Sequence, residues 1–103
     1  MASGSGRVVR GSLVGTGSAI DVRTVGFRPA SVKVHNVTGN CFGHWQESMP
    51  DASAQKTVDS GSGTTDVSLI TSNGITPLSD GFRFGADSDL NAAAEVVHYE
   101  ASE

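Results

Sequence analysis

The sequence predicts a single all-β domain, a small sandwich or barrel of short and mostly antiparallel strands. Clusters of Gly, Pro, Asn, Asp and Ser recur at short intervals, and the segments between them alternate apolar and polar residues. The 13 glycines and the low share of charged residues, 17%, do not fit the long surface helices of a bundle or coiled coil. These patterns do not separate a sandwich from a barrel, because both are built from such strands.

Four strands are predicted in the first half of the chain. The clearest alternation has Ile20 and Val22 on one face, with Asp21 and Arg23 on the other. Turn residues separate the four segments, since Gly and Pro favour backbone angles that interrupt a strand. The predicted strands span residues 7–14, 19–25, 31–37 and 41–47.

The second half of the chain is predicted to hold three further strands and a long irregular segment. Residues 48–63 are interpreted as a loop with one short strand at 56–58. Asn73-Gly74 is a strong turn dipeptide and predicts that the preceding strand ends before it. Residues 89–95, which include three consecutive alanines, are compatible with one helical turn. The predicted strands span residues 66–71, 82–84 and 95–101.

The length of 103 residues fits one domain, which we place at residues 11–103, behind a flexible N-terminal arm at residues 1–10. The first six residues are small, so we interpret them as a frayed terminus or as a segment that orders on a partner. There is no secretory signal pattern, and no apolar run approaches the roughly 18 residues that span a membrane. The single cysteine, Cys41, excludes an internal disulfide.

The charge of the chain argues against binding to nucleic acid. The net charge is −4, and the seven Lys and Arg residues are scattered over the whole sequence. A nucleic-acid-binding domain normally concentrates basic residues on one face. We therefore predict no direct contact with nucleic acid and none with a membrane.

One acidic segment resembles the start of a calcium loop but departs from that pattern. Asp87, Asp89 and Asn91 have the alternate spacing of the first ligands of an EF-hand. The pattern then requires a glycine and a glutamate, and Ala92 and His98 stand in those positions. We interpret the segment as a polar turn whose side chains bond to their own backbone, and we predict no metal site.

No residue pattern in the chain predicts catalysis or a cofactor. His35, His44 and His98 lack the spacing of metal ligands and are interpreted as surface or partly buried residues. Cys41 and His44 are three apart on one strand, which points their side chains to opposite faces, so the thiol is interpreted as a small buried hydrophobe. Close carboxylates such as Glu95 with Glu100 could support glycoside hydrolysis, but nothing places them around a cleft. We predict a protein that is not an enzyme.

Interaction residues are therefore the functional residues that we predict. Short strands leave exposed edges that a soluble protein must cover or pair, which favours an oligomer or docking on a larger surface. Trp45 is interpreted either as a core anchor or as an interface anchor, because tryptophan is common in both places. The predicted anchors are Phe27, Trp45 and Tyr99, and the predicted arm contacts are Arg7, Val8, Val9 and Arg10.

Turn residues are predicted to set the strand register rather than to act chemically. This group comprises Asn73, Gly74, Asp80, Gly81 and Gly85. Among them, Gly81 is predicted to reject valine if its φ is positive and to accept it otherwise.

A set of motifs between Gly26 and Glu100 lies mostly in turns and strand edges. The motifs are Gly26-Phe27-Arg28-Pro29, His44-Trp45, Ile70-Thr71-Ser72-Asn73-Gly74-Ile75-Thr76-Pro77-Leu78, Ser79-Asp80-Gly81-Phe82, Gly85-Ala86-Asp87 and Asp89-Leu90-Asn91. In these motifs the segment resembles small structural proteins of tailed bacteriophages and prophages, and also repeated modules of phage tail-associated proteins. The resemblance covers about three quarters of the chain.

This resemblance implies a virion component that is made in the bacterial host cytoplasm. One placement is a capsid decoration, or cement, protein that binds the major capsid protein on the outer surface of the head, often as a trimer, and braces neighbouring subunits. The other placement is a tail, baseplate or fibre-associated module that binds neighbouring tail proteins or a host glycan. The short chain and the lack of a fibre stalk favour decoration.

Overall fold

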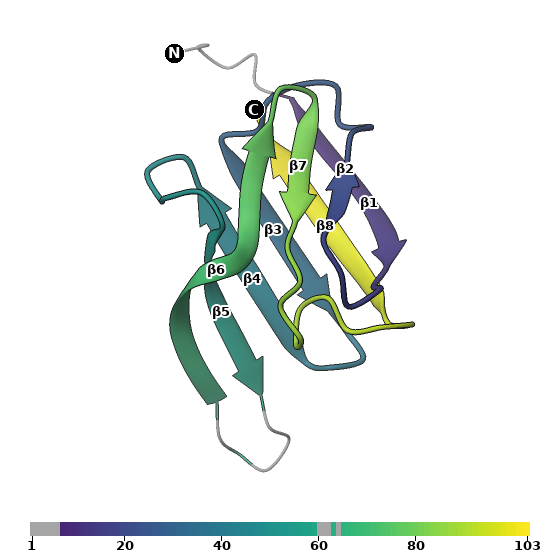
Figure 1. Ribbon diagram of the computed structural model, residues 1–103, viewed down its shortest axis with the longest axis vertical. Helices are drawn as coiled ribbons and strands as arrows, with labels where there is room; N and C mark the ends of the chain where they lie inside the picture. The colour runs from purple at the N-terminus through teal and green to yellow at the C-terminus, as the bar shows by residue number, and fades with distance from the viewer. Residues whose placement is uncertain (1–6, 60–62, 64) are drawn as a thin grey trace.

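A computed structural model describes residues 7–59, 63 and 65–103, which form one antiparallel sheet. The sheet has eight strands in the order β1-β8-β3-β4-β5-β6-β7-β2 (Figure 1). This arrangement confirms the predicted all-β domain. The strands are β1 (Val8–Val14), β2 (Ile20–Val22), β3 (Ser31–Asn36), β4 (Cys41–Gln46), β5 (Ser53–Asp59), β6 (Thr65–Leu78), β7 (Gly81–Phe84) and β8 (Val96–Ser102).

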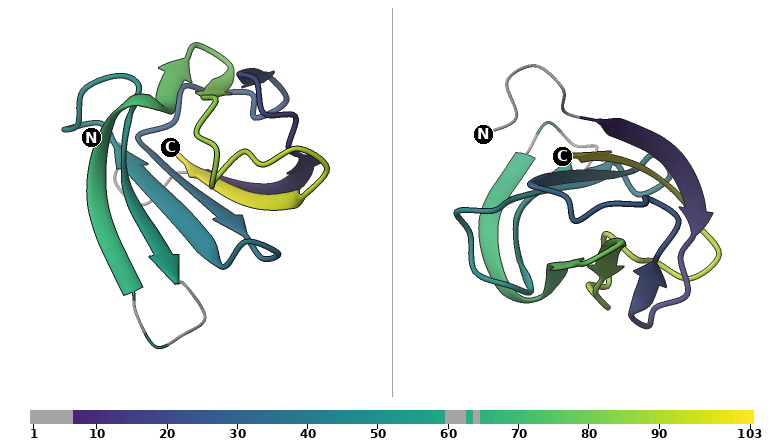
Figure 2. Two further views of the ribbon diagram at one scale, coloured as in Figure 1. Left: turned by 60° about the horizontal axis from the view of Figure 1, so that its bottom comes forward. Right: turned by 90° about the horizontal axis from the view of Figure 1, so that it is seen from above.

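The sheet curls into a half-barrel. Strands β1, β8, β3, β4 and β5 form a broad layer, and β6 carries the sheet round so that β7 and β2 face the inner side of that layer (Figure 2). The two edge strands, β1 and β2, follow each other in the sequence and do not pair with one another in the described part of the chain. The segment between them, residues 15–19, spans the open side.

A bend in β6 makes this curl possible, and it lies where a turn was predicted. The prediction that the strand ends before Asn73-Gly74 is wrong, because β6 continues through both residues. The register against β5 shifts here, so that Ser53 lies opposite Ile75 while the next residue of β5 lies opposite Ile70. Asn73 has a positive φ of 58°, a conformation that asparagine tolerates well. The turn residues therefore form a bulge that redirects one strand from the broad layer to the inner side.

Three other expectations about local structure need correction. Residues 53–59 form the full strand β5 rather than a loop, because pairing with β4 and β6 satisfies their backbone despite weak apolar alternation. Residues 89–95 form turns, and no helix occurs in the described ranges. Strand β1 begins at Val8, so residues 8–10 of the predicted arm lie in the sheet, whereas residues 1–6 fall outside the described structure.

The core fills the inside of the half-barrel. Trp45 from β4, Phe82 and Phe84 from β7 and Ile75 from β6 are almost completely buried there. Leu90 enters the same cluster from the segment between β7 and β8. The smaller members of the cluster are valines and small residues of the facing strands, Val22, Val32, Val34, Cys41, Val97 and Ala101.

Asn91 joins the segment between β7 and β8 to the connection between the edge strands. Its side chain is fully buried, and its Nδ2 donates hydrogen bonds to the carbonyl oxygens of Ser18 (2.7 Å) and Gly85 (2.9 Å). Its Oδ1 accepts a hydrogen bond from the backbone N–H of Thr16 at 2.9 Å. The backbone N–H of Gly17 donates to the Asn91 carbonyl at 3.1 Å. Asn91 thus fixes the connection between the edge strands against the segment between β7 and β8.

We expect Asn91→Ala to lower the free energy of unfolding by about 3 kcal/mol. The change leaves up to three buried or partly buried backbone groups without a partner, and each such group costs about 1–3 kcal/mol. Chemical denaturation measures the effect, with Gln55→Ala, an exposed amide on β5, as the control. Equal stability of the two variants would contradict this role for Asn91.

We also expect Gly81→Ala to lower the melting temperature by about 10 °C or more. Gly81 is not among the residues with positive φ, so its backbone conformation alone would allow a side chain. A β-carbon on Gly81 would instead lie 1.7 Å from the carbonyl oxygen of Val22, which forces β2 away from β7. A thermal melt of this variant beside Ser79→Ala, at an exposed neighbouring position, tests the close approach. A melting temperature unchanged by Gly81→Ala would refute it.

Candidate functional site

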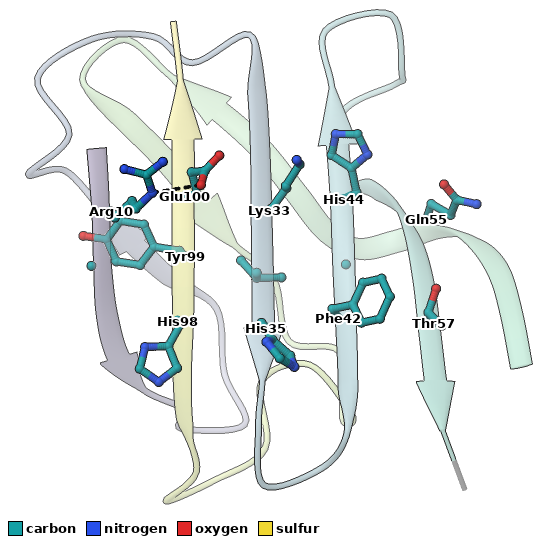
Figure 3. Close-up of a pocket in the computed structure, with 13 residues that line it drawn as sticks. Arg10, Lys33, His35, Phe42, His44, Gln55, Thr57, His98, Tyr99 and Glu100 are labelled. Atoms are coloured by element: carbon teal, nitrogen blue, oxygen red, sulfur yellow. Dashed lines mark hydrogen bonds and ion pairs between the residues drawn. The ribbon is translucent and has the colours of Figure 1, made fainter. Parts of the chain in front are cut away.

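The outer face of the broad layer carries two rows of side chains across neighbouring strands. Strand pairing aligns the first row as Arg10, Glu100, Lys33, His44 and Gln55. It aligns the second row as His98, His35, Phe42 and Thr57 (Figure 3). The two rows line a shallow hollow of about 600 Å³, which we call the histidine face.

All three histidines of the chain lie on this face. His35 and His98 are directly opposite each other on β3 and β8. The ring of Phe42 meets the ring of His35 edge-on, with centroids 6.0 Å apart and an interplanar angle of 85°. His44 lies one row away, with its Nε2 3.5 Å from the Ser31 hydroxyl oxygen. The spacing of the three histidines in the sequence gives no reason to group them, and the structure brings them together on one face.

The charges of the histidine face are unevenly paired. Glu100 lies between two cations, and its Oε2 accepts a hydrogen bond from Arg10 Nε at 3.0 Å. Lys33 is directly opposite Glu100 across the strands, yet no ion pair involving Lys33 occurs in the described residues. The Lys33 ammonium is therefore exposed beside His35 and His44, and it is available to an incoming anion.

A second exposed surface lies on the hairpin of β5 and β6, which extends beyond the barrel (Figure 1). Val67 and Leu69 are 60% and 63% exposed, which is high for branched apolar side chains in a strand. With Met49 they line a hollow of about 490 Å³ that continues from His44 and Gln55 over β6. We call Met49, Val67 and Leu69 the hairpin patch.

The first half of β6 also has a free edge. Residues 65–70 pair with β5 on one side, and β6 meets β7 only from Ile75 onward. Within the described ranges nothing pairs with the other side of residues 65–70. A row of unpaired N–H and C=O groups of this kind is a template for strand addition by another chain.

The three predicted aromatic anchors point into the barrel. Trp45 is 1% exposed because it has the same orientation in β4 as the buried Cys41, and its Nε1 donates to the Pro50 carbonyl at 3.0 Å. Phe27 is also buried. Tyr99 is partly buried, with its ring 5.4 Å from that of Phe82. In this conformation Trp45 and Phe27 hold the core and offer no ring to a partner.

The predicted arm contacts lie along the edge strand or just before it. The Arg7 guanidinium covers the Phe27 ring at 4.8 Å and pairs with Glu103 at 2.8 Å. The hydrogen bond to Glu103 and its charge raise the pKa of Arg7. Val8 and Arg10 point outward, whereas Val9 packs against the core. These contacts tie the start of the described chain to its end.

Cys41 is a structural thiol rather than a nucleophile. It lies in the core and its Sγ donates to the Asp89 carbonyl at 3.0 Å. Burial, followed by the negative charges of Asp89 and Asp87, raises the pKa of Cys41 to about 11. His44 points to the opposite face of β4, as the strand alternation predicts, so it cannot act as a base for this thiol.

The acidic segment at residues 87–91 is the polar turn that the sequence predicts. Asp87 Oδ1 accepts hydrogen bonds from the backbone N–H groups of Asp89 and Leu90, at 3.0 and 3.1 Å. The Lys56 ammonium contacts the carboxylates of both aspartates, at 3.1 Å for Asp87. Burial alone would lower the pKa of Lys56, but the hydrogen bonds to Asp89 and Asp87 outweigh it and the pKa is raised. The positive charge of Lys56 thus compensates the two neighbouring carboxylates.

The outer surface offers exposed apolar side chains on the hairpin patch, and a lysine and three imidazoles on the histidine face. The described residues contain no group of three or more His, Cys, Asp or Glu side chains placed to hold a metal ion. They also form no helix long and apolar enough to cross a membrane. Comparisons of the chain with protein-family models, with curated proteins and with solved structures found no match.

Only part of these two surfaces can be predicted from the sequence. Alternation places Lys33 and His35 on one side of their strand, and Phe42 and His44 on one side of the next. Nothing in the sequence indicates that β8 lies beside β3, which is the pairing that brings His98 to His35. The hairpin patch is not evident from the sequence, because the interpretation of residues 48–63 as a loop leaves the predicted strand at 66–71 without its partner β5.

We expect native Cys41 to react with Ellman's reagent at pH 8 at least a hundredfold more slowly than a free cysteine. A thiol pKa of about 11 reduces the thiolate fraction at pH 8 by roughly this factor, and burial adds to it. Absorbance at 412 nm follows the reaction, with the same protein in guanidinium chloride as the positive control. Rapid reaction of the native protein would contradict the buried position.

Proposed function

We propose that the chain is a non-enzymatic structural protein that docks on a larger protein assembly, and that this assembly is a phage head. In this proposal the protein decorates the outer capsid surface and stabilises contacts between subunits of the major capsid protein. The resemblance over residues 26–100 gives the proposal its specific form. The observation that supports docking most strongly is the exposed apolar surface of the hairpin patch.

The hairpin patch has the properties of a repeated docking contact. Burying a valine or leucine side chain contributes roughly 1.5–3 kcal/mol, so one hairpin supplies only weak binding after the cost of association is subtracted. Many weak contacts held at fixed spacing on a shell become strong together. The free edge at residues 65–70 adds main-chain hydrogen bonding to the apolar contact.

A homo-oligomer, with a trimer favoured by the resemblance, is part of this proposal. Three hairpins on one trimer would engage three neighbouring capsid subunits at once, which is how a small protein braces a shell. The tail-associated module remains the alternative. It would use the same hairpin patch on tail proteins, and it differs in partner rather than in surface.

We expect the double variant Val67→Ser, Leu69→Ser to reduce co-sedimentation with particles that lack the protein by about tenfold or more. Loss of two exposed apolar contacts costs each site more than the roughly 1.4 kcal/mol that a factor of ten requires. Stability should change little, because both side chains are exposed in the free chain.

The matched control is Val14→Ser, Val37→Ser, since these valines are 57% and 54% exposed but lie away from the hairpin. Circular dichroism of both double variants verifies the fold. Undiminished co-sedimentation of the hairpin variant, or an equal loss in both variants, would refute the hairpin patch as the docking surface.

A further inference from the structure

We propose that the histidine face is a second binding site, which takes an extended protein segment rich in carboxylates and binds it more tightly as the pH falls from 7.5 to 5.5. This site goes beyond the proposed function, because it lies on other residues than the hairpin patch and needs no capsid. Its ligand class follows from the charge, the shape and the titratable groups of the face.

The histidine face is positively charged although the chain as a whole is acidic. The chain as a whole has a net charge of −4. The histidine face carries one carboxylate, Glu100, against two permanent cations and all three histidines. With neutral histidines this face has a net charge of +1, since Arg10 and Lys33 outweigh Glu100, and protonation of the three imidazoles brings it to +4. An acidic protein thus offers a cationic surface at one place.

The geometry fits an extended chain. The two rows of the face are two residues apart along each strand, which corresponds to about 6.7 Å and equals the repeat of alternate side chains in an extended peptide. Phe42 is 50% exposed between His35 and His44, and it provides a flat apolar contact for one ligand side chain. Lys33 and the imidazoles surround that contact with groups that can donate hydrogen bonds to carboxylate oxygens.

A polyanionic nucleic acid fits this face less well than an acidic peptide. A net charge of +1 releases few counterions, and Glu100 would repel a phosphate backbone that crossed the row. Isolated carboxylates on a flexible peptide can avoid Glu100 and still reach Lys33 and the imidazoles. The observations therefore favour a protein ligand.

The pH dependence follows from linkage. Imidazole side chains ordinarily change charge between pH 5 and 8, and a bound carboxylate favours the protonated form. The charged groups facing the histidines are Arg10 of β1, Glu100 of β8 and Lys33 of β3. The neighbouring strands β5 and β6 contribute only neutral side chains, namely Gln55, Thr57, Val67, Ser68 and Leu69. Ligand carboxylates are still ionised at pH 5.5 because their ordinary pKa is near 4.3. Lower pH therefore adds positive charge to the site without discharging the ligand.

The test uses two hexapeptides that differ only in charge. The probe is N-acetylated and C-amidated Glu-Phe-Glu-Glu-Phe-Glu, and the control has Gln in place of each Glu. Titration into the labelled protein, followed by ¹H–¹⁵N NMR at pH 7.5 and 5.5, gives the affinity and the residues perturbed. We expect shifts at His35, Phe42 and His98, and an affinity about tenfold higher at pH 5.5, because each exposed ion pair contributes a few-fold at most.

Variants separate this site from general electrostatic attraction. The double variant His35→Gln, His98→Gln should lose most of the gain in affinity between pH 7.5 and 5.5, because only His44 of the three imidazoles remains on the face. Both side chains are exposed, so the fold should persist. Arg83→Gln removes an exposed cation on β7, away from the face, and should leave both the affinity and its pH dependence unchanged.

Several results would overturn the proposal. These are equal affinity for the acidic and the Gln peptide, no gain in affinity at pH 5.5, or shifts confined to residues outside the histidine face. Absence of any binding, or tighter binding of oligothymidylate than of the acidic peptide, would do so as well. None of these results bears on particle binding by the hairpin patch, so the failure of one proposal is distinguishable from the failure of the other.

Discussion

The hydrogen bonds of the Asn91 side chain join the connection between the two edge strands to the segment between β7 and β8. Strands β1 and β2 follow one another in the chain but have no ladder between them in the described structure. The connection between them is held instead by bonds to other segments, among them those of Asn91 with Thr16, Ser18 and Gly85. Asn36 supports the same segment from β3, because its Nδ2 donates to the Asp89 carbonyl at 3.0 Å and to the Glu95 carboxylate at 2.8 Å. Two buried amides thus fix the segment between β7 and β8 against its surroundings.

The curl of the sheet separates the roles of the two faces. The inner face is filled by the aromatic rings and valines, so the predicted anchors Trp45 and Phe27 are committed to stability. The side chains of the outer face are not part of the core. This face can therefore carry histidines, an exposed phenylalanine and a lysine without an ion pair in the described structure, with little loss of stability. The hairpin of β5 and β6 extends past the rest of the barrel, so its apolar side chains Val67 and Leu69 are exposed rather than packed in the core.

The fold class and most strands could be predicted, because period-two alternation and turn residues are local signals. Residues 31–36 and 41–46 illustrate this, since their inward and outward sides are those that the alternation indicates. Long-range properties could not be predicted. The sequence does not show that β8 inserts between β1 and β3, nor that Asn73-Gly74 bends a strand instead of ending it. The histidine face and the hairpin patch both depend on such pairings, so the sequence alone does not indicate that their residues lie together.

We propose that this domain docks on a phage head, and the position of the protein on the particle tests this proposal most directly. Immunogold electron microscopy of the source particles, with antibody against this chain, gives that position. The account predicts label distributed over the heads. Label confined to the tail would contradict the capsid placement and favour the tail-associated module, and absence of label from every particle would contradict a virion role altogether.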